Sequence, residues 1–186
     1  LDNAVVRAIM DRRSVRKYKP EPVPKEMLDV ILHCGINAPN AMNEQRWEVR
    51  VTNSKAFIDG VTKVFIESAE NDERVQKLVK NPDFHNMFRN APTVIFVAGK
   101  ADEKSSPIDC GMLGENIMLA AQSMGLGTCC LGSAAGFLNS NPGAANYLKQ
   151  LAFSDGYELL YAIAIGYPDE SPEAKPRDAS KIRYIE

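Results

Sequence analysis

The chain has 186 residues, of which 45% are hydrophobic and 25% are charged, and its formal net charge is −2. These values are typical of a globular protein with a sizeable core, and they weigh against general nucleic-acid binding, which needs a broadly basic surface. No apolar run reaches the length of a membrane span, and the first ten residues lack the apolar region of a secretory signal. We therefore expect one cytoplasmic domain over residues 1–186, without nucleic-acid or membrane partners.

Apolar spacing predicts helices over Asn3–Arg12 and Lys25–Gly35, followed by a loop at Ala38–Asn43. Pro24 suits the start of the second helix, and Gly35 suits its end. Alternation over Trp47–Thr52 then predicts a strand with one polar face.

The segment from Ser54 to Asn90 is charged and mostly helical in pattern. Its later part, Asn71–Arg89, is more polar and is interrupted at Asn81-Pro82. A segment with so little apolar surface to bury is a candidate mobile lid. His85 lies in it, and we interpret that side chain as solvated rather than catalytic.

Two apolar segments follow the lid. Pro92–Gly99 is continuous in apolar character, as in a strand buried on both faces. Asp109–Gly125 is apolar around most of its circumference, which predicts a buried helix, in the core or at a subunit interface. Asp109 has the character of an N-cap for that helix.

The remaining elements are short. We expect strands at Thr128–Gly132 and Glu158–Ile165 and a helix at Asn146–Leu151. The polar stretch Ser171–Ser180 predicts an extended arm, and the alternating tail Lys181–Ile185 predicts an edge strand. Strands scattered among helices, with few hairpin signals, indicate an α+β protein whose sheet is packed between helices.

Cysteines and histidines give no sign of a metal site. The four cysteines and two histidines lack zinc-ligand spacing, and no C-x-x-C pair occurs. Cys129 and Cys130 are adjacent and would face opposite sides of a strand, so we interpret both as reduced, buried small residues.

A basic run, Arg12-Arg13-Ser14-Val15-Arg16-Lys17-Tyr18, joins the first helix to the turn-forming segment 20–24. Guanidinium groups match phosphate oxygens well, and a serine hydroxyl adds a further donor. Taken alone, the run is more typical of a solvated basic face than of an anion site. Lys175-Pro176-Arg177 supplies a second cationic pair near the other end of the chain. The basic run and the pair Lys175 and Arg177 can both bind the same phosphate group.

Four motifs in order make the chain resemble the FMN-dependent nitroreductase family. The basic run is similar to the family's R-R-S-x-R-x-F/Y element, and Ala38-Pro39-Asn40-Ala41-Met42-Asn43-Glu44-Gln45-Arg46-Trp47 is similar to its A-P-S-x-x-N-x-Q-P-W loop. Asp109-Cys110-Gly111, Asn116 and Gly125-Leu126-Gly127-Thr128 resemble its buried helix and glycine end. Gly166-Tyr167-Pro168 with Lys175-Pro176-Arg177 resembles its closing signature. Asn40 and Arg46 depart from the family's serine and proline.

The resemblance implies a nitroreductase-like fold: a mostly antiparallel central sheet surrounded by helices, with a C-terminal arm that extends onto the partner subunit. It implies a homodimer with non-covalent FMN at the interface. NADH or NADPH would reduce the FMN, and nitroaromatics, quinones or similar small acceptors would reoxidise it in a ping-pong cycle. The alternatives are a related flavin enzyme, for reductive dehalogenation or flavin fragmentation, and a non-enzymatic anion- or nucleic-acid-binding module.

Site residues follow from the same resemblance, position by position. Arg12, Ser14, Lys175 and Arg177 would hold the FMN phosphate, with Arg13 near it, and Arg16 would reach the pyrimidine edge of the ring. Cys130, Leu131 and Gly132 would line the ring. Pro39, Asn40, Ala41, Asn43 and Gln45 would come from the partner subunit. No side chain in these motifs is suited to act as a catalytic acid or base, which fits a cofactor that carries the chemistry.

Overall fold

The computed structural model describes residues 3–185, and over that range it contains a four-stranded sheet in the order β1-β2-β4-β3. The strands are β1 (Trp47–Thr52), β2 (Thr93–Lys100), β3 (Gly127–Leu131) and β4 (Tyr157–Gly166). Each neighbouring pair is antiparallel. The prediction of an α+β protein built on a mostly antiparallel sheet is therefore confirmed.

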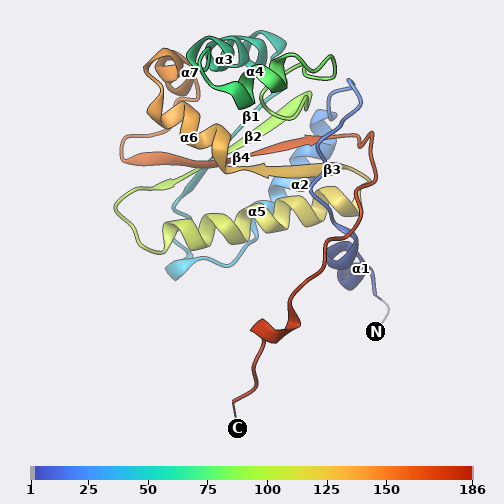
Figure 1. The fold of residues 1–186 in the computed structure, drawn as a ribbon. Coiled ribbons are helices and arrows are strands. Elements are labelled where there is room, and N and C mark those ends of the chain that lie inside the picture. Colours follow the sequence, from blue (N-terminus) through green and yellow to red (C-terminus); the bar gives the residue numbers. More distant parts are fainter. Residues whose placement is uncertain (1–2, 186) are drawn as a thin grey trace.

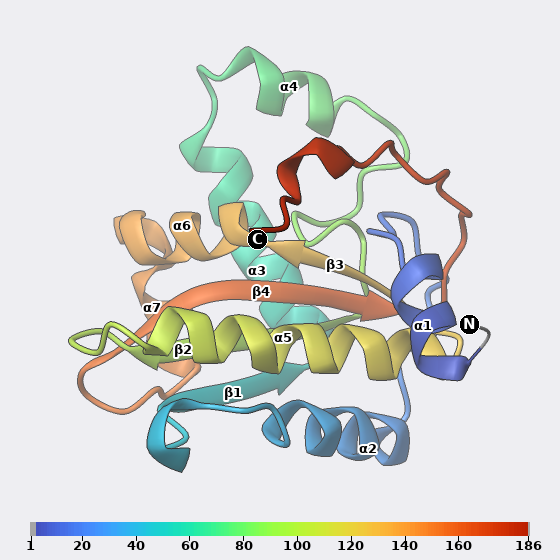
Figure 2. The ribbon, with the colours of Figure 1, turned by 90° about the horizontal axis from the view of Figure 1, so that it is seen from below.

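Helices cover both faces of this sheet (Figure 1). α2 (Lys25–Ile36) and α5 (Ser106–Ser123) lie on one face, whereas α3 (Lys55–Ser68), α4 (Glu73–Val79), α6 (Gly132–Ser140) and α7 (Ala145–Gln150) lie on the other. α1 (Ala4–Asp11) packs against the C-terminal end of α5 (Figure 2). Single 3₁₀ turns occur at Ala41–Asn43, Pro142–Ala144 and Ala179–Lys181.

The core consists of two apolar layers that β2 separates. Alternate residues of a strand face opposite sides of the sheet. Val94 and Phe96 accordingly join the cluster beneath α3 and α6, whereas Ile95 and Val97 join the cluster beneath α2 and α5. All four are completely buried. A continuous apolar run at this position thus reflects a strand that is covered on both faces.

Several predicted elements need correction. β1 has the predicted bounds, but α5 begins at Ser106, three residues early, with Ser105 as its N-cap residue. The prediction that Asp109 caps this helix is therefore wrong. α6 was not predicted, because the glycine- and alanine-rich segment 132–136 lacks a helical apolar pattern. The predicted edge strand at Lys181–Ile185 is also wrong: these residues are exposed and pair with no strand among residues 3–185.

The two ends of the chain run side by side next to β3. Lys19 N–H donates to the carbonyl of Tyr167, and Asp169 N–H donates to that of Lys17, both at 2.9 Å. Beyond this pairing the C-terminal tail leaves the body of the molecule (Figure 1). Within residues 3–185, none of the helices combines the length and apolar character needed to cross a bilayer.

Candidate functional site

The basic run lies against the start of β3. Val15 N–H donates to the carbonyl of Thr128 at 2.9 Å, and Ser14 forms a parallel bridge with Thr128. Gly127 permits this approach, since a Cβ at that position would fall 2.8 Å from the Val15 Cβ. β3 is an edge strand. The run therefore places arginines along the edge of the sheet.

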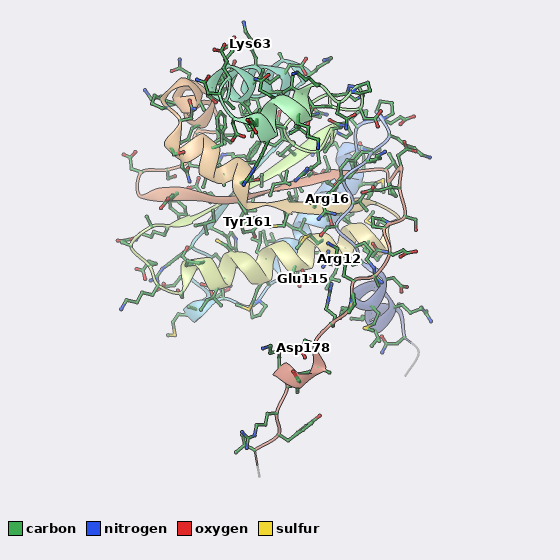
Figure 3. All side chains as sticks on the ribbon, viewed as in Figure 1. Arg12, Arg16, Lys63, Glu115, Tyr161 and Asp178 are labelled. Atoms are coloured by element: carbon green, nitrogen blue, oxygen red, sulfur yellow. The ribbon has the colours of Figure 1, made fainter. Side chains whose placement is uncertain are left out.

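Arg12 has an unsatisfied donor at this edge. Its Nε is buried and has no hydrogen-bond partner within residues 3–185, and it forms an ion pair at 3.5 Å with Glu115 Oε1 of α5. Figure 3 shows Arg12 and Glu115 close together, and Asp178 far off on the tail. A buried donor without an acceptor is unfavourable by about 1–3 kcal/mol, so this nitrogen favours an added acceptor such as an anion.

The other two arginines of the run make local contacts. Arg13 donates to the carbonyls of Met10 at 2.6 Å and Arg12 at 2.8 Å. Arg16 Nη1 donates to the carbonyl of Ser14 at 2.9 Å, and the Arg16 backbone N–H donates to Glu170 Oε1 at 2.5 Å. The Arg16 guanidinium is thus positioned by one neutral carbonyl, and it makes no ion pair within the described chain.

Three cations act electrostatically on the cysteines of β3. Burial raises the pKa of the Cys129 thiol, and the charges of Arg16, Arg89 and Arg12 oppose that rise. Cys130 is more exposed, but partial desolvation of its thiol and the neighbouring Cys129 also raise its pKa, against the charge of Arg12. Arg89 comes from the segment between α4 and β2 and was not identified from the sequence, because it belongs to no recognisable motif. Its proximity is set by the fold alone.

The end of β3 leads directly into α6. Leu131 is buried, whereas Cys130 and Gly132 are exposed, so the prediction that Cys130 is buried is wrong. Cys130 faces the side of the sheet opposite to the buried Cys129, and at the edge strand β3 this side leaves Cys130 exposed. Leu131 provides no side-chain cap for the first amides of α6, and a Cβ on Gly132 would meet no atom within 4 Å. The first amides of α6 are therefore uncapped, and the space beside Gly132 is open.

The segment 39–45 lies elsewhere in the protomer. Ala41 N–H points at both carboxylate oxygens of Asp109, each 3.3 Å away, near the N-terminal end of α5. α1 and the basic run lie toward the opposite end of α5 (Figure 2). The structure thus brings Arg12, Ser14, Arg16 and the β3 end together, and it leaves Pro39, Asn40, Ala41, Asn43 and Gln45 apart from them within one chain.

Asn40 and Arg46, the two departures from the family pattern, both make contacts within their own chain. Asn40 Oδ1 accepts the backbone N–H of Gln45 at 2.9 Å and so closes the loop across five residues. Arg46 pairs with Glu103 at 2.5 Å and with Glu44. The extra cation is therefore neutralised by carboxylates of its own chain.

Lys175 and Arg177 lie on the exposed tail. Arg177 Nη1 donates to the carbonyl of Lys175 at 3.2 Å, and the structure shows no contact between either residue and the basic run. The pairing of residues 167–169 with 17–19 nevertheless starts this tail beside the run. Convergence of the two basic sets stays a prediction.

A cavity of about 950 Å³ adjoins the basic run. Arg16 and Ser133 line it on the side of β3 and α6, and Phe84, His85 and Arg89 line it on the side of the segment predicted as a lid. α4 in that segment has no buried residue, and Lys17 Nζ lies 3.8 Å from Asp83 Oδ2 across the opening. Mobility of this segment stays a prediction. Among residues 3–185, no His, Cys, Asp and Glu side chains are grouped so as to hold a metal ion.

The nitroreductase family model matches residues 9–167, and the chain belongs to this family. An NADPH-flavin oxidoreductase of Vibrio harveyi is 28% identical over 186 residues, an alignment that covers 94% of this chain and 70% of that protein. Two solved nitroreductases with bound FMN align over 100% of both chains. The one from Desulfitobacterium hafniense gives a TM-score of 0.88 at 26% identity, and the one from Bacteroides fragilis gives 0.86 at 25%.

Proposed function

We propose that this protein is an FMN-dependent oxidoreductase that takes electrons from NADH or NADPH and passes them to a small organic acceptor. The observation that carries the proposal is the arrangement at the edge of β3. There the buried, unsatisfied Nε of Arg12 and the uncapped, open start of α6 at Gly132 border the same strand. Membership of the nitroreductase family and the likeness to FMN-bound structures support the same conclusion.

The residues present fit FMN. The Arg12 nitrogen that lacks a hydrogen bond suits a phosphate oxygen, and the uncapped amides at the start of α6 suit the polar edge of a flat ring. The phosphate ligands would be Arg12, Ser14, Lys175 and Arg177, with Arg13 nearby. The ring ligands would be Arg16, Cys130, Leu131 and Gly132. When bound, FMN supplies hydride and electron transfer, which no protein side chain provides.

The protein's own contribution is to bind, orient and stabilise charge. Arg16 would place a fixed cation beside the ring, partly shielded from water, and so favour extra negative charge there. The cavity between Ser133 and Phe84 offers one place for the nicotinamide and then for the acceptor. If the nicotinamide and the acceptor bind in this cavity one after the other, the reaction follows a ping-pong cycle. Solvent would supply the protons.

We further propose a homodimer in which each site takes residues from both subunits. The loop residues Pro39, Asn40, Ala41, Asn43 and Gln45 are remote from the basic run of their own chain, so they can complete a site only across an interface. An apolar groove of about 850 Å³ between α1, α2 and α5 supports such an interface. Its rim exposes Val5 and Val30, 65% and 52% accessible. The tail carrying Lys175 would extend onto the partner.

Steady-state kinetics test the proposed cycle. NADH or NADPH is varied at several fixed concentrations of a quinone, and the series is repeated with a nitroaromatic. We expect parallel double-reciprocal lines with both acceptors, because the donor leaves before the acceptor binds. Lines that converge with both acceptors would show a ternary complex and contradict the single shared place.

A further inference from the structure

Asp109 is a buried carboxylate whose role the helix does not explain. It lies in the first turn of α5, is 4% exposed, and forms no ion pair within residues 3–185. It does not cap α5, which starts after Ser105. Its two oxygens instead share one donor, the backbone N–H of Ala41, 68 residues away in sequence.

Asp109 lies in the first helical turn of α5, a position that suits an acidic side chain. Negative charge is favoured near a helix N-terminus, where the peptide dipoles leave partial positive charge. An ionised carboxylate is a stronger acceptor than a neutral oxygen. α5 therefore presents a fixed acceptor to the loop that begins at Ala41.

That loop has an unfavourable backbone. Met42, Asn43 and Gln45 have φ values of 53°, 54° and 50°, in the left-handed region that non-glycine residues disfavour. Core packing does not compensate, since Met42 is 90% exposed and Asn43 and Gln45 are exposed too. Strained backbone of this kind persists only where the surroundings hold it, and it is frequent at functional sites.

Hydrogen bonds hold the loop from both ends. Asp109 holds Ala41 at its start, and Ser106 Oγ donates to the carbonyl of Arg46 at 3.1 Å at its end. Both come from the first turn of α5. The Asn40 side chain closes the loop internally but does not tie it to the rest of the protein.

We propose that Asp109 is a positioning residue, which holds residues 41–45 in the strained shape that reaches the FMN of the partner subunit. The link of this proposal to FMN rests on the proposed function. The dependence of the loop conformation on Asp109 is independent of the proposed function. If Asp109 is removed, the loop relaxes, and binding of FMN must then restore the strained shape at the expense of affinity.

The test compares three variants of the full chain. Asp109→Ala removes the acceptor, and Asp109→Asn keeps the shape with a weaker, neutral acceptor. Cys110→Ala is the matched control, because Cys110 is the next residue of α5 and is completely buried. Its thiol interacts with the carbonyl of Ala98 and with Ser106, and the substitution removes neither of the two bonds that hold the loop. Amide hydrogen exchange over residues 40–46 and the dissociation constant of FMN are measured for each.

We expect Asp109→Ala to speed exchange at 41–45 and to weaken FMN binding, each by at least about tenfold, the factor for about 1.4 kcal/mol. Asp109→Asn should recover most of both losses, and Cys110→Ala should show neither. Exchange and affinity in Asp109→Ala equal to those of Cys110→Ala would overturn the proposal. If Asp109→Ala does not fold, the amides of residues 41–45 must still exchange faster in Asp109→Asn than in Cys110→Ala. Equal exchange rates in these two variants would overturn the proposal. A wild-type protein that binds no FMN contradicts the proposed function instead, and loop exchange then still tests Asp109.

Discussion

Gly127 and Val15 approach so closely that no side chain fits between them: a Cβ on Gly127 would lie 2.8 Å from the Val15 Cβ and 2.9 Å from both Val15 methyl carbons. Val15 belongs to the basic run, and Gly127 starts β3. The contact is therefore what allows the arginines to follow the edge of the sheet. It explains in packing terms why β3 begins with a glycine.

Gly127→Ala should lower the free energy of unfolding by about 1–3 kcal/mol, because Val15 is buried and its branched side chain cannot move aside. Urea denaturation measures the loss. Gly136→Ala is the control, since a Cβ there meets no atom within 4 Å inside α6, and alanine should be neutral or stabilising by up to about 1 kcal/mol. Equal stability of the two variants would show that the contact is not tight.

Arg177→Ala should weaken FMN binding by at least about tenfold, since a charge-assisted hydrogen bond to phosphate contributes roughly 1.5–3 kcal/mol. Fluorescence titration of the flavin-free protein gives the dissociation constant. Arg183→Ala, on the same exposed tail, is the control and should bind FMN as the wild type does. Normal FMN affinity in Arg177→Ala would remove the tail from the phosphate site.

Arg16→Ala should still bind FMN but accept hydride from NADH or NADPH at least about tenfold more slowly, because the cation beside the ring is lost. His85→Ala, on the opposite wall of the cavity, should change the same rate by less than about tenfold, below typical general-acid effects. Stopped-flow reduction and reoxidation of the flavin separate the two half-reactions. A His85→Ala enzyme that is reduced normally but cannot pass electrons on would reveal a proton donor missing from our account.

Deletion of residues 171–186 should weaken the dimer and remove FMN together, since the proposed arm and the two cations leave at once. A Lys175→Ala/Arg177→Ala double variant should lose FMN but stay dimeric. Light scattering and flavin content at low micromolar concentration distinguish the two proteins. A stable monomer that keeps its flavin after the deletion would contradict the composite site.

The sequence predicted most of the sheet and the basic run but only part of the site. Strands such as Trp47–Thr52 and Pro92–Gly99 have side-chain periodicities that depend only on which faces are buried, so their patterns were sufficient. α6 was missed, because its first residues are small and show no helical apolar pattern. Their helical conformation depends on packing against the sheet directly after β3. The tail at Ile182 alternates as a strand does, but alternation cannot supply a pairing partner.

Long-range contacts set the remaining features of the site. Arg89 is one of the cations that act on Cys129. The fold brings it there from the segment between α4 and β2, and no local motif marks it. Asp109 looked like a cap because acidic residues favour the first helical turn, but its acceptor role depends on Ala41, which only the fold brings near. Cys130 is exposed because β3 lies at the edge of the sheet, and no local pattern reports strand order.

The visible absorption spectrum of the purified, dialysed protein tests the central claim most directly. We predict a yellow protein that retains stoichiometric FMN and is bleached anaerobically by NADH or NADPH, with the colour restored when a quinone or nitroaromatic is added. A protein that stays colourless after incubation with FMN and dialysis, or a yellow protein that neither nucleotide bleaches, would contradict the proposed function.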